Sequence, residues 1–129
     1  FAEYEHLYSQ RTKDVSHEGL DIGPEEIVSA RSGRAKLRAE LHALMEQQQI
    51  DLWICPPSTG TAPLGINATG DPIMNLPWTH AGLPALNIPT HYTSDNLPFG
   101  LQIVGDAGRD EYLLACAQPL ADIFASNMR

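Results

Sequence analysis

The stretch from Thr69 to Pro89, TGDPIMNLPWTHAGLPALNIP, constrains the fold of this chain more than any other. It holds four prolines and two glycines among mostly apolar side chains. Each proline fixes its own φ angle and restricts the residue before it, whereas flexible linkers are rich in small polar residues. We therefore predict a shaped, buried surface, with a short helix over residues 72–81 and a strand over residues 85–88.

The flanking segments predict helices and strands around this stretch. The sequence Gly23-Pro24 is typical of a helix start, and the apolar positions that follow predict a helix ending near Gln49. Residues 50–56, IDLWICP, form a short apolar run that predicts a strand buried on both faces. Residues 91–96 predict a turn. Residues 97–105 predict a strand in which Gln102 must find hydrogen-bond partners, at a sheet edge or in a pocket.

The two ends of the chain are expected to be helical. Apolar residues at Phe1, Tyr4, Leu7 and Tyr8 have the spacing of one amphipathic helix within a polar lead-in over residues 1–22. At the other end of the chain, a helix is expected to start near residue 109. Pro119 within it would remove a hydrogen bond to a carbonyl one turn earlier, so we expect a kink or two short helices.

This order of elements predicts the α/β class, with a partial mixed sheet flanked by helices. Residues 23–126 would supply helix, strand, loop, strand, strand and helix. Three strands with two of them buried on both faces need more cover than these helices offer. We therefore interpret residues 1–129 as one segment of a larger domain.

Charge and composition exclude several classes of protein. The formal net charge of −8 argues against nucleic acid or an anionic membrane as the partner. No apolar run approaches the roughly 20 residues that span a bilayer, and the first residues lack the pattern of a signal peptide, so a cytoplasmic location is expected. Cys55 and Cys116 are not in a C-x-x-C pair and are expected to be reduced thiols.

The usual catalytic patterns are missing from the sequence. No serine lies in G-x-S-x-G, and Ser32 and Lys36, four residues apart, are interpreted as solvated helix surface. The histidines are scattered without metal-ligand spacing, and residues 58–67 lack the lysine of a phosphate-binding loop. We expect no metal and no cofactor.

Two residues of the central stretch allow two readings each. His80 has a side chain suited to acid or base chemistry, but it could equally satisfy a backbone group in a packed loop. Asp71 lies between Gly70 and Pro72, where it could cap a helix or contact a polar substituent of a ligand.

Four segments, in order and spacing, resemble the C-terminal part of the amidase signature family of amide hydrolases: DLWICPPSTGTAP, GDPIMNLPWTHAGLPALNIP, LPFGLQIVG and DEYLLACA. The resemblance implies the C-terminal portion of that family's fold. It also implies hydrolysis by a serine nucleophile, with a second serine and a lysine as proton-handling partners, in an N-terminal region whose Gly/Ser-rich loop forms the oxyanion hole. That region is absent here, and neither Lys13 nor Lys36 lies in a matching context, so no catalytic residue is assigned.

The resemblance also indicates which residues would line a substrate pocket. Thr79 stands where family members usually have Asn, which alters any polar contact from that position. Met74 and Trp78 would form an apolar wall of the kind a small amide requires, with Asp71, Thr79 and His80 as the polar candidates.

The main hypothesis is therefore the C-terminal part of an amidase, inactive alone, that supplies part of the sheet and one pocket wall. Its partners would be a small amide substrate and the missing N-terminal part, and exposed strand edges could cause self-association. The alternative is a non-catalytic binding or structural module that retains this part of the fold.

Overall fold

The computed structural model of this chain describes residues 2–127. The chain forms two compact units, Phe1–Gly33 and Arg34–Arg129, which divide within one long helix, α2 (Pro24–Gln48). Helix α2 begins at Pro24, as predicted, and continues through Gly33 without interruption. It ends one residue before the predicted boundary, and Gln49 has a left-handed φ of 52°.

The first unit contains two short helices before α2. They are the 3-10 helix η1 (Ala2–Leu7) and the helix α1 (Gln10–Leu20). The short helix predicted before the polar stretch is found as η1, and the polar stretch after it forms a second helix, α1. Ser9 explains the division: its hydroxyl accepts a hydrogen bond from the Thr12 backbone N–H at 3.3 Å, which caps α1.

The second unit is built around a three-stranded sheet. Its strands are β1 (Trp53–Cys55), β2 (Ala85–Tyr92) and β3 (Pro98–Val104), in the order β1-β3-β2. The other elements of this unit, besides the second half of α2, are η2 (Pro72–Met74), α3 (Leu76–Ala81) and α4 (Asp110–Asn127). The expected α/β class is confirmed. Both strand pairings in the described residues are antiparallel, so the mixed pairing that was expected is not seen within this chain.

The β2–β3 hairpin is longer than the sequence predicted. Strand β2 extends to Tyr92, past the predicted end at residue 88 and into the predicted turn. The turn itself is closed by a hydrogen bond from the Thr93 N–H to the Leu97 carbonyl at 2.9 Å. Asn96 takes a left-handed φ of 59°, which asparagine tolerates better than most residues.

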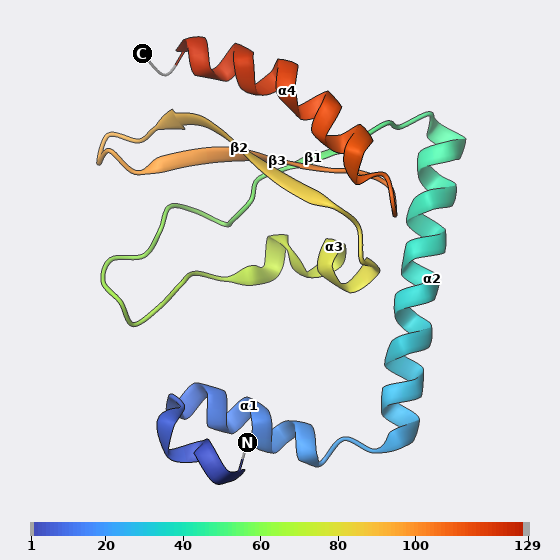
Figure 1. Cartoon of the computed structure of the whole chain (residues 1–129), viewed down its shortest axis with the longest axis vertical. Helices are drawn as coiled ribbons and strands as arrows, with labels where there is room; N and C mark the ends of the chain where they lie inside the picture. The colour runs from blue at the N-terminus through green and yellow to red at the C-terminus, as the bar shows by residue number, and fades with distance from the viewer. Residues whose placement is uncertain (1, 128–129) are drawn as a thin grey trace. The chain divides into compact units, whose positions relative to one another are not determined.

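Helix α4 covers one face of β2 and β3 (Figure 1). The buried residues of this layer are Ile88, Ile103, Leu113 and Ala117, each at most 4% exposed. Helix α4 continues through Pro119 as a single helix, so the expected division into two short helices is not observed.

The opposite face of the sheet packs against α3 and the second half of α2. The buried residues here are Ala81, Leu83 and Val104, with Trp53 and Trp78 packed against them. Strand β1 is not buried on both faces as predicted, because it is an edge strand. Ile54, on the other side of β1 from Trp53, is 62% exposed.

Candidate functional site

Helix α3 carries three of the five predicted pocket residues and is anchored at its C-terminal end. Gly82 has a φ of 69°, and the Leu83 N–H bonds to the Trp78 carbonyl at 3.0 Å, which closes the helix in a Schellman motif. From α2, the Arg34 Nε donates to the His80 carbonyl at 3.1 Å and the Arg38 Nε donates to the Ala81 carbonyl at 2.6 Å. Two guanidinium groups therefore hold the negative end of this helix.

The apolar candidates, Met74 and Trp78, are both half-buried. The ring of Trp78 stacks on that of Trp53 from β1, with the centroids 6.3 Å apart and an interplanar angle of 26°. Both indole N–H groups are buried and have no hydrogen-bond partner among the described residues. An indole N–H usually finds a hydrogen-bond acceptor when it is buried, so each of these two rings has a donor without an acceptor among the described residues.

The polar candidates all lie at the surface. Asp71 accepts a hydrogen bond from the Ile73 N–H at 2.9 Å and caps η2, as the capping reading predicted. Thr79 and His80 are exposed on α3. The reading in which the His80 side chain satisfies a backbone group is wrong for the described residues. Only the His80 carbonyl is bonded there, because the packing brings Arg34 to it.

A row of polar side chains crosses the sheet on the face toward α3. Cys55, Gln102 and Asn87 lie side by side on β1, β3 and β2, since Gln102 is in register with both of the others. Gln102 is 6% exposed. Its Oε1 accepts from the Cys55 thiol at 3.1 Å, and its Nε2 donates to Asn75 Oδ1 at 2.6 Å. The prediction that this glutamine needs partners is confirmed.

Asn75 links this row to the segment after β1. It lies between η2 and α3, and its Nδ2 donates to the Pro57 carbonyl at 3.1 Å. Asn75 was not among the residues predicted from the sequence. The available signal was a lone carboxamide between Met74 and Leu76 in an apolar stretch, which needs a partner for the same reason as Gln102.

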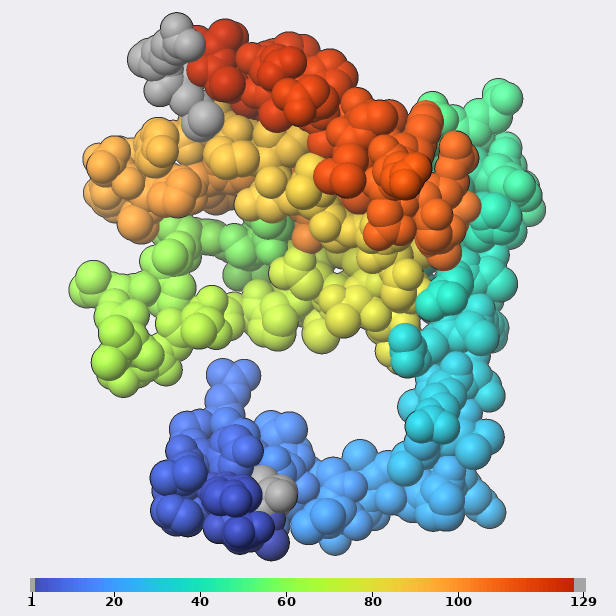
Figure 2. Space-filling view, in the orientation of Figure 1, coloured from blue at the N-terminus to red at the C-terminus, as the bar shows by residue number. Residues whose placement is uncertain are grey.

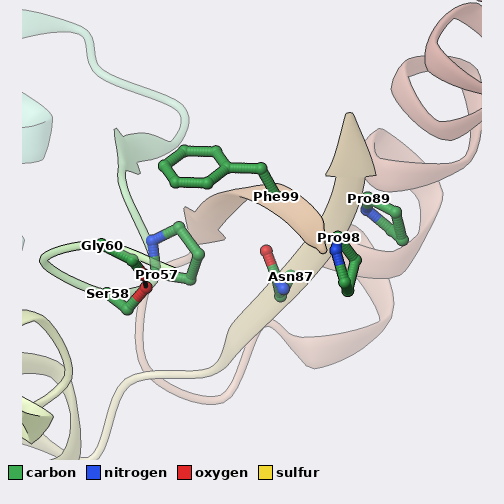
Figure 3. A pocket seen from close by; sticks show the side chains of 8 residues that line it. Pro57, Ser58, Gly60, Asn87, Pro89, Pro98 and Phe99 are labelled. Atoms are coloured by element: carbon green, nitrogen blue, oxygen red, sulfur yellow. Dashed lines mark hydrogen bonds between the residues drawn. The ribbon is translucent and has the colours of Figure 1, made fainter. Parts of the chain in front are cut away.

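Next to the polar row lies a cavity of about 220 Å³ (Figure 3). Its walls come from the loop after β1 and from the β2–β3 hairpin, and the surface is hollowed beside that loop, which is green in Figure 2. The lining residues are Pro57, Ser58, Gly60, Asn87, Pro89, Pro98, Phe99 and Gly100. This cavity was not predictable from the sequence, because the loop and the hairpin are separated by more than twenty residues and neither carries a motif.

Asn87 occupies the middle of this group, between the rings of Pro57 and Pro98 (Figure 3). Its carboxamide lies over Gly100 on the neighbouring strand, so closely that a Cβ at Gly100 would collide with it. Glycine weakens a strand, and its presence in a strand often marks a close approach of other atoms. Here the missing side chain makes room for the Asn87 carboxamide.

A separate charged cluster joins α2 to the segment after β3. His42 Nδ1 lies 2.7 Å from Asp106 Oδ2, and His42 Nε2 lies 3.5 Å from Glu46 Oε1. The hydrogen bond and the charge of Asp106, with a smaller contribution from Glu46, raise the pKa of His42 above its usual 6.5. These three side chains line a second cavity of about 390 Å³ with Asp51, Arg109 and Tyr112.

The serine and lysine weighed in the sequence have ordinary helical partners. The Ser32 hydroxyl donates to the Val28 carbonyl at 3.0 Å, and Lys36 Nζ lies 3.9 Å from Glu40 Oε1. Cys55 and Cys116 are both free thiols, as expected. Within residues 2–127 there is no group of three or more His, Cys, Asp or Glu side chains placed to hold a metal ion. No helix in that range is long and apolar enough to cross a membrane.

Comparison with known proteins identifies the family. Residues 25–114 match the model of the family described as Amidase. A glutamyl-tRNA(Gln) amidotransferase subunit from a Picosynechococcus species is 37% identical over 76 residues, which cover 54% of this chain and 16% of that protein. The corresponding protein of a Cyanothece species is 30% identical over 97 residues, covering 70% of this chain and 20% of the relative.

A solved structure described as a crystal structure of amidase has the same fold. It is 26% identical to this chain, with a TM-score of 0.75, and the match covers 89% of this chain but only 29% of the other. The chain thus spans a small part of the length of the relatives it matches. Since the family model covers most of the chain, including the polar row and α3, this protein belongs to the amidase family.

Proposed function

We propose that this chain is the C-terminal part of an amide hydrolase. It supplies three strands of the core sheet and one wall of the substrate pocket. The serine nucleophile, the second serine and the lysine that the family resemblance implies lie upstream, in a part of the domain outside these 129 residues. The observation that carries this proposal is the family match over residues 25–114, which spans the whole sheet and α3.

The pairing of the serines and lysines supports the assignment of catalysis to another part. Ser32 and Ser58 donate to backbone carbonyls, of Val28 and Gly60, and neither hydroxyl is bonded to a lysine or histidine among the described residues. A serine becomes a nucleophile when an adjacent base accepts its proton, and neither of these two serines is bonded to such a base among the described residues.

The pocket wall is formed by the apolar candidates, with the polar ones at its edge. Met74 and Trp78 are half-buried and present apolar surface, while Asp71, Thr79 and His80 are exposed, Asp71 with one carboxylate oxygen bonded in the η2 cap. Small-molecule sites combine apolar walls with a few polar groups in this way. The substrate is a small amide.

Complementation tests the proposal. The chain is mixed with an amidase from which the matching C-terminal part has been deleted, and release of ammonia from simple aliphatic and aromatic amides is measured. Turnover is expected in the mixture and in neither component alone. Turnover by the chain alone that survives Ser32→Ala and Lys36→Ala would show an active site within these residues and overturn the proposal.

A non-catalytic binding module is the second candidate. The observation that favours it is the cavity beside Asn87, whose walls come entirely from this chain. A module of this kind would bind a small ligand and leave the truncated amidase inactive in the mixture. The same experiment therefore separates the two functions.

A further inference from the structure

We infer that Arg38 on α2, assisted by Arg34, is a positioning residue for α3. Its guanidinium group fixes the last turn of that helix and so sets where the side chains of the pocket wall lie. The pocket itself rests on the proposed function, whereas the positioning of α3 does not. Both arginines act through the backbone of α3, and neither is assigned a contact with the substrate.

Helix α3 is too short to hold its own position, because it has only six residues. Isolated helices shorter than about 12–15 residues are marginal in water, so this helix depends on contacts with other elements. At its N-terminal end, Asn75 is bonded to Gln102 and to the Pro57 carbonyl. In the middle of the helix, Trp78 stacks on Trp53. These contacts leave the last residues of α3 to be held from α2.

The last carbonyl groups of α3 show how α2 holds it. The final four carbonyls of a helix have no partner within the helix, and a buried carbonyl needs one. The cap at Gly82 bonds the first two of them. The other two accept hydrogen bonds from α2: the His80 carbonyl from Arg34 Nε at 3.1 Å, and the Ala81 carbonyl from Arg38 Nε at 2.6 Å.

Arg38 is the stronger of the two anchors. Ala81 is fully buried and the hydrogen bond to its carbonyl is part-buried, whereas the bond from Arg34 is exposed. The Arg38 guanidinium also occupies the space that a side chain at Gly82 would fill, since a Cβ there would lie 2.5 Å from one of its terminal nitrogens. A charged donor strengthens a hydrogen bond, and here the positive charge faces the negative end of the helix.

The turn held by Arg38 carries three side chains of the proposed pocket. Trp78, Thr79 and His80 directly precede Ala81 in α3, so a shift of the Ala81 carbonyl moves all three together. Such a shift changes the wall and leaves unchanged the nucleophile that the proposed function places upstream. Substrate and transition state would then both bind more weakly. That loss raises KM and leaves kcat unchanged.

Amide hydrogen exchange of the 129-residue chain, followed by NMR, tests the positioning of α3. Arg38→Met keeps an unbranched side chain but removes the donor. The Leu83 N–H, which closes the cap, should exchange at least about tenfold faster, the size expected when a hydrogen bond to a charged group is lost. The Ile103 N–H in the central strand should change much less. Lys36→Met is the matched control. It removes the same charge from an exposed position on α2 and should leave Leu83 unchanged.

Kinetics in the complementation mixture test the link to the pocket, with each variant chain at a saturating concentration. Arg38→Met is expected to raise KM for a simple amide about threefold to tenfold, with kcat changed by less than about twofold. A loss of folded chain would instead lower kcat and leave KM unchanged. Arg38→Lys keeps a charged donor and should recover most of the loss. Arg34→Met should act like Arg38→Met, but more weakly.

The positioning role would be overturned by unchanged exchange at Leu83 in Arg38→Met, by an equal change in Lys36→Met, or by equal acceleration at Leu83 and Ile103. In an active mixture, a lower kcat at unchanged KM would overturn the link to the pocket. If the mixture with the unaltered chain is inactive, the proposed function fails, and hydrogen exchange alone decides whether Arg38 positions α3. If Arg38→Met does not fold, Arg34→Met replaces it in both measurements under the same criteria.

Discussion

The two faces of the sheet differ in what they hold. On the face toward α4, Ile88 and Ile103 pack against Leu113 and Ala117 with almost no exposure. On the opposite face, apolar packing around Val104 gives way along the strands to the polar row of Cys55, Gln102 and Asn87. Apolar packing has no directional requirement, whereas a buried polar group needs a partner in one place. We infer that the first face supplies stability and the second supplies the site.

The largest expected effect is a loss of stability on truncating Ile103, compared with its register partner Ile54 on the neighbouring strand. Ile103 and Ile54 are register partners on β3 and β1, but Ile103 is fully buried and Ile54 is 62% exposed. Ile103→Ala should lower the free energy of unfolding by about 2–5 kcal/mol, through lost burial and the cavity left behind. Urea denaturation followed by circular dichroism measures it. Ile54→Ala is the matched control, because Ile54 is on the same face of the sheet but α4 leaves it exposed; an equal loss there would contradict burial under α4 as the source of the effect.

The next effect tests the bonded part of the polar row. Gln102→Leu should cost about 1–3 kcal/mol of unfolding free energy, because Asn75 and Cys55 lose their partner in a part-buried position. Asn87→Leu should cost much less, since that carboxamide has no partner to lose among the described residues. In a double-mutant cycle, Gln102 and Asn75 should show coupling of about 0.5–3 kcal/mol. Additive effects would mean that the row is not a network.

A smaller effect concerns the end of α3, which borders the polar face. Gly82→Ala should cost about 1–2 kcal/mol, because φ is 69° and a Cβ would lie 2.5 Å from an Arg38 guanidinium nitrogen. Gly60→Ala is the control, as φ is not positive there and nothing lies within 4 Å of the added carbon. Thermal unfolding of both variants measures the difference. A stabilised Gly82→Ala variant would show that α3 is not held by this cap.

The smallest expected effect is a pH dependence at the charged cluster. The pKa of His42 is raised in the folded chain, so protonated His42 stabilises the fold below the ordinary pKa of 6.5. That contribution is lost as the pH rises through the higher folded value. An NMR titration of the His42 ring should show the raised pKa, and Asp106→Asn should lower it. Since both partners are accessible to solvent, the change in stability should shrink with added salt. An unchanged pKa in Asp106→Asn would remove Asp106 as the cause.

Local chemistry predicted much of the fold. The start of α2 at Pro24, the cap at Asp71, the strand containing Gln102 and the α/β class all depend on neighbours in sequence. The need of Gln102 for partners was also predictable, because it follows from burying any carboxamide. The prediction of burial failed at β1, because the helices that cover a strand are distant from it in the sequence. Ile54 is exposed because α4 packs on β2 and β3 and leaves β1 at the edge.

The site divides in the same way. The sequence by itself determined the family, the apolar character of Met74 and Trp78, and the lack of a recognisable nucleophile. Only the tertiary structure decided that Asn87 lies over Gly100, that Asn75 completes the bonding of Gln102, and that the loop after β1 closes a cavity. The physical reason is that these contacts join residues far apart in the chain. The register of β2 on β3 sets their geometry, and no local pattern encodes it.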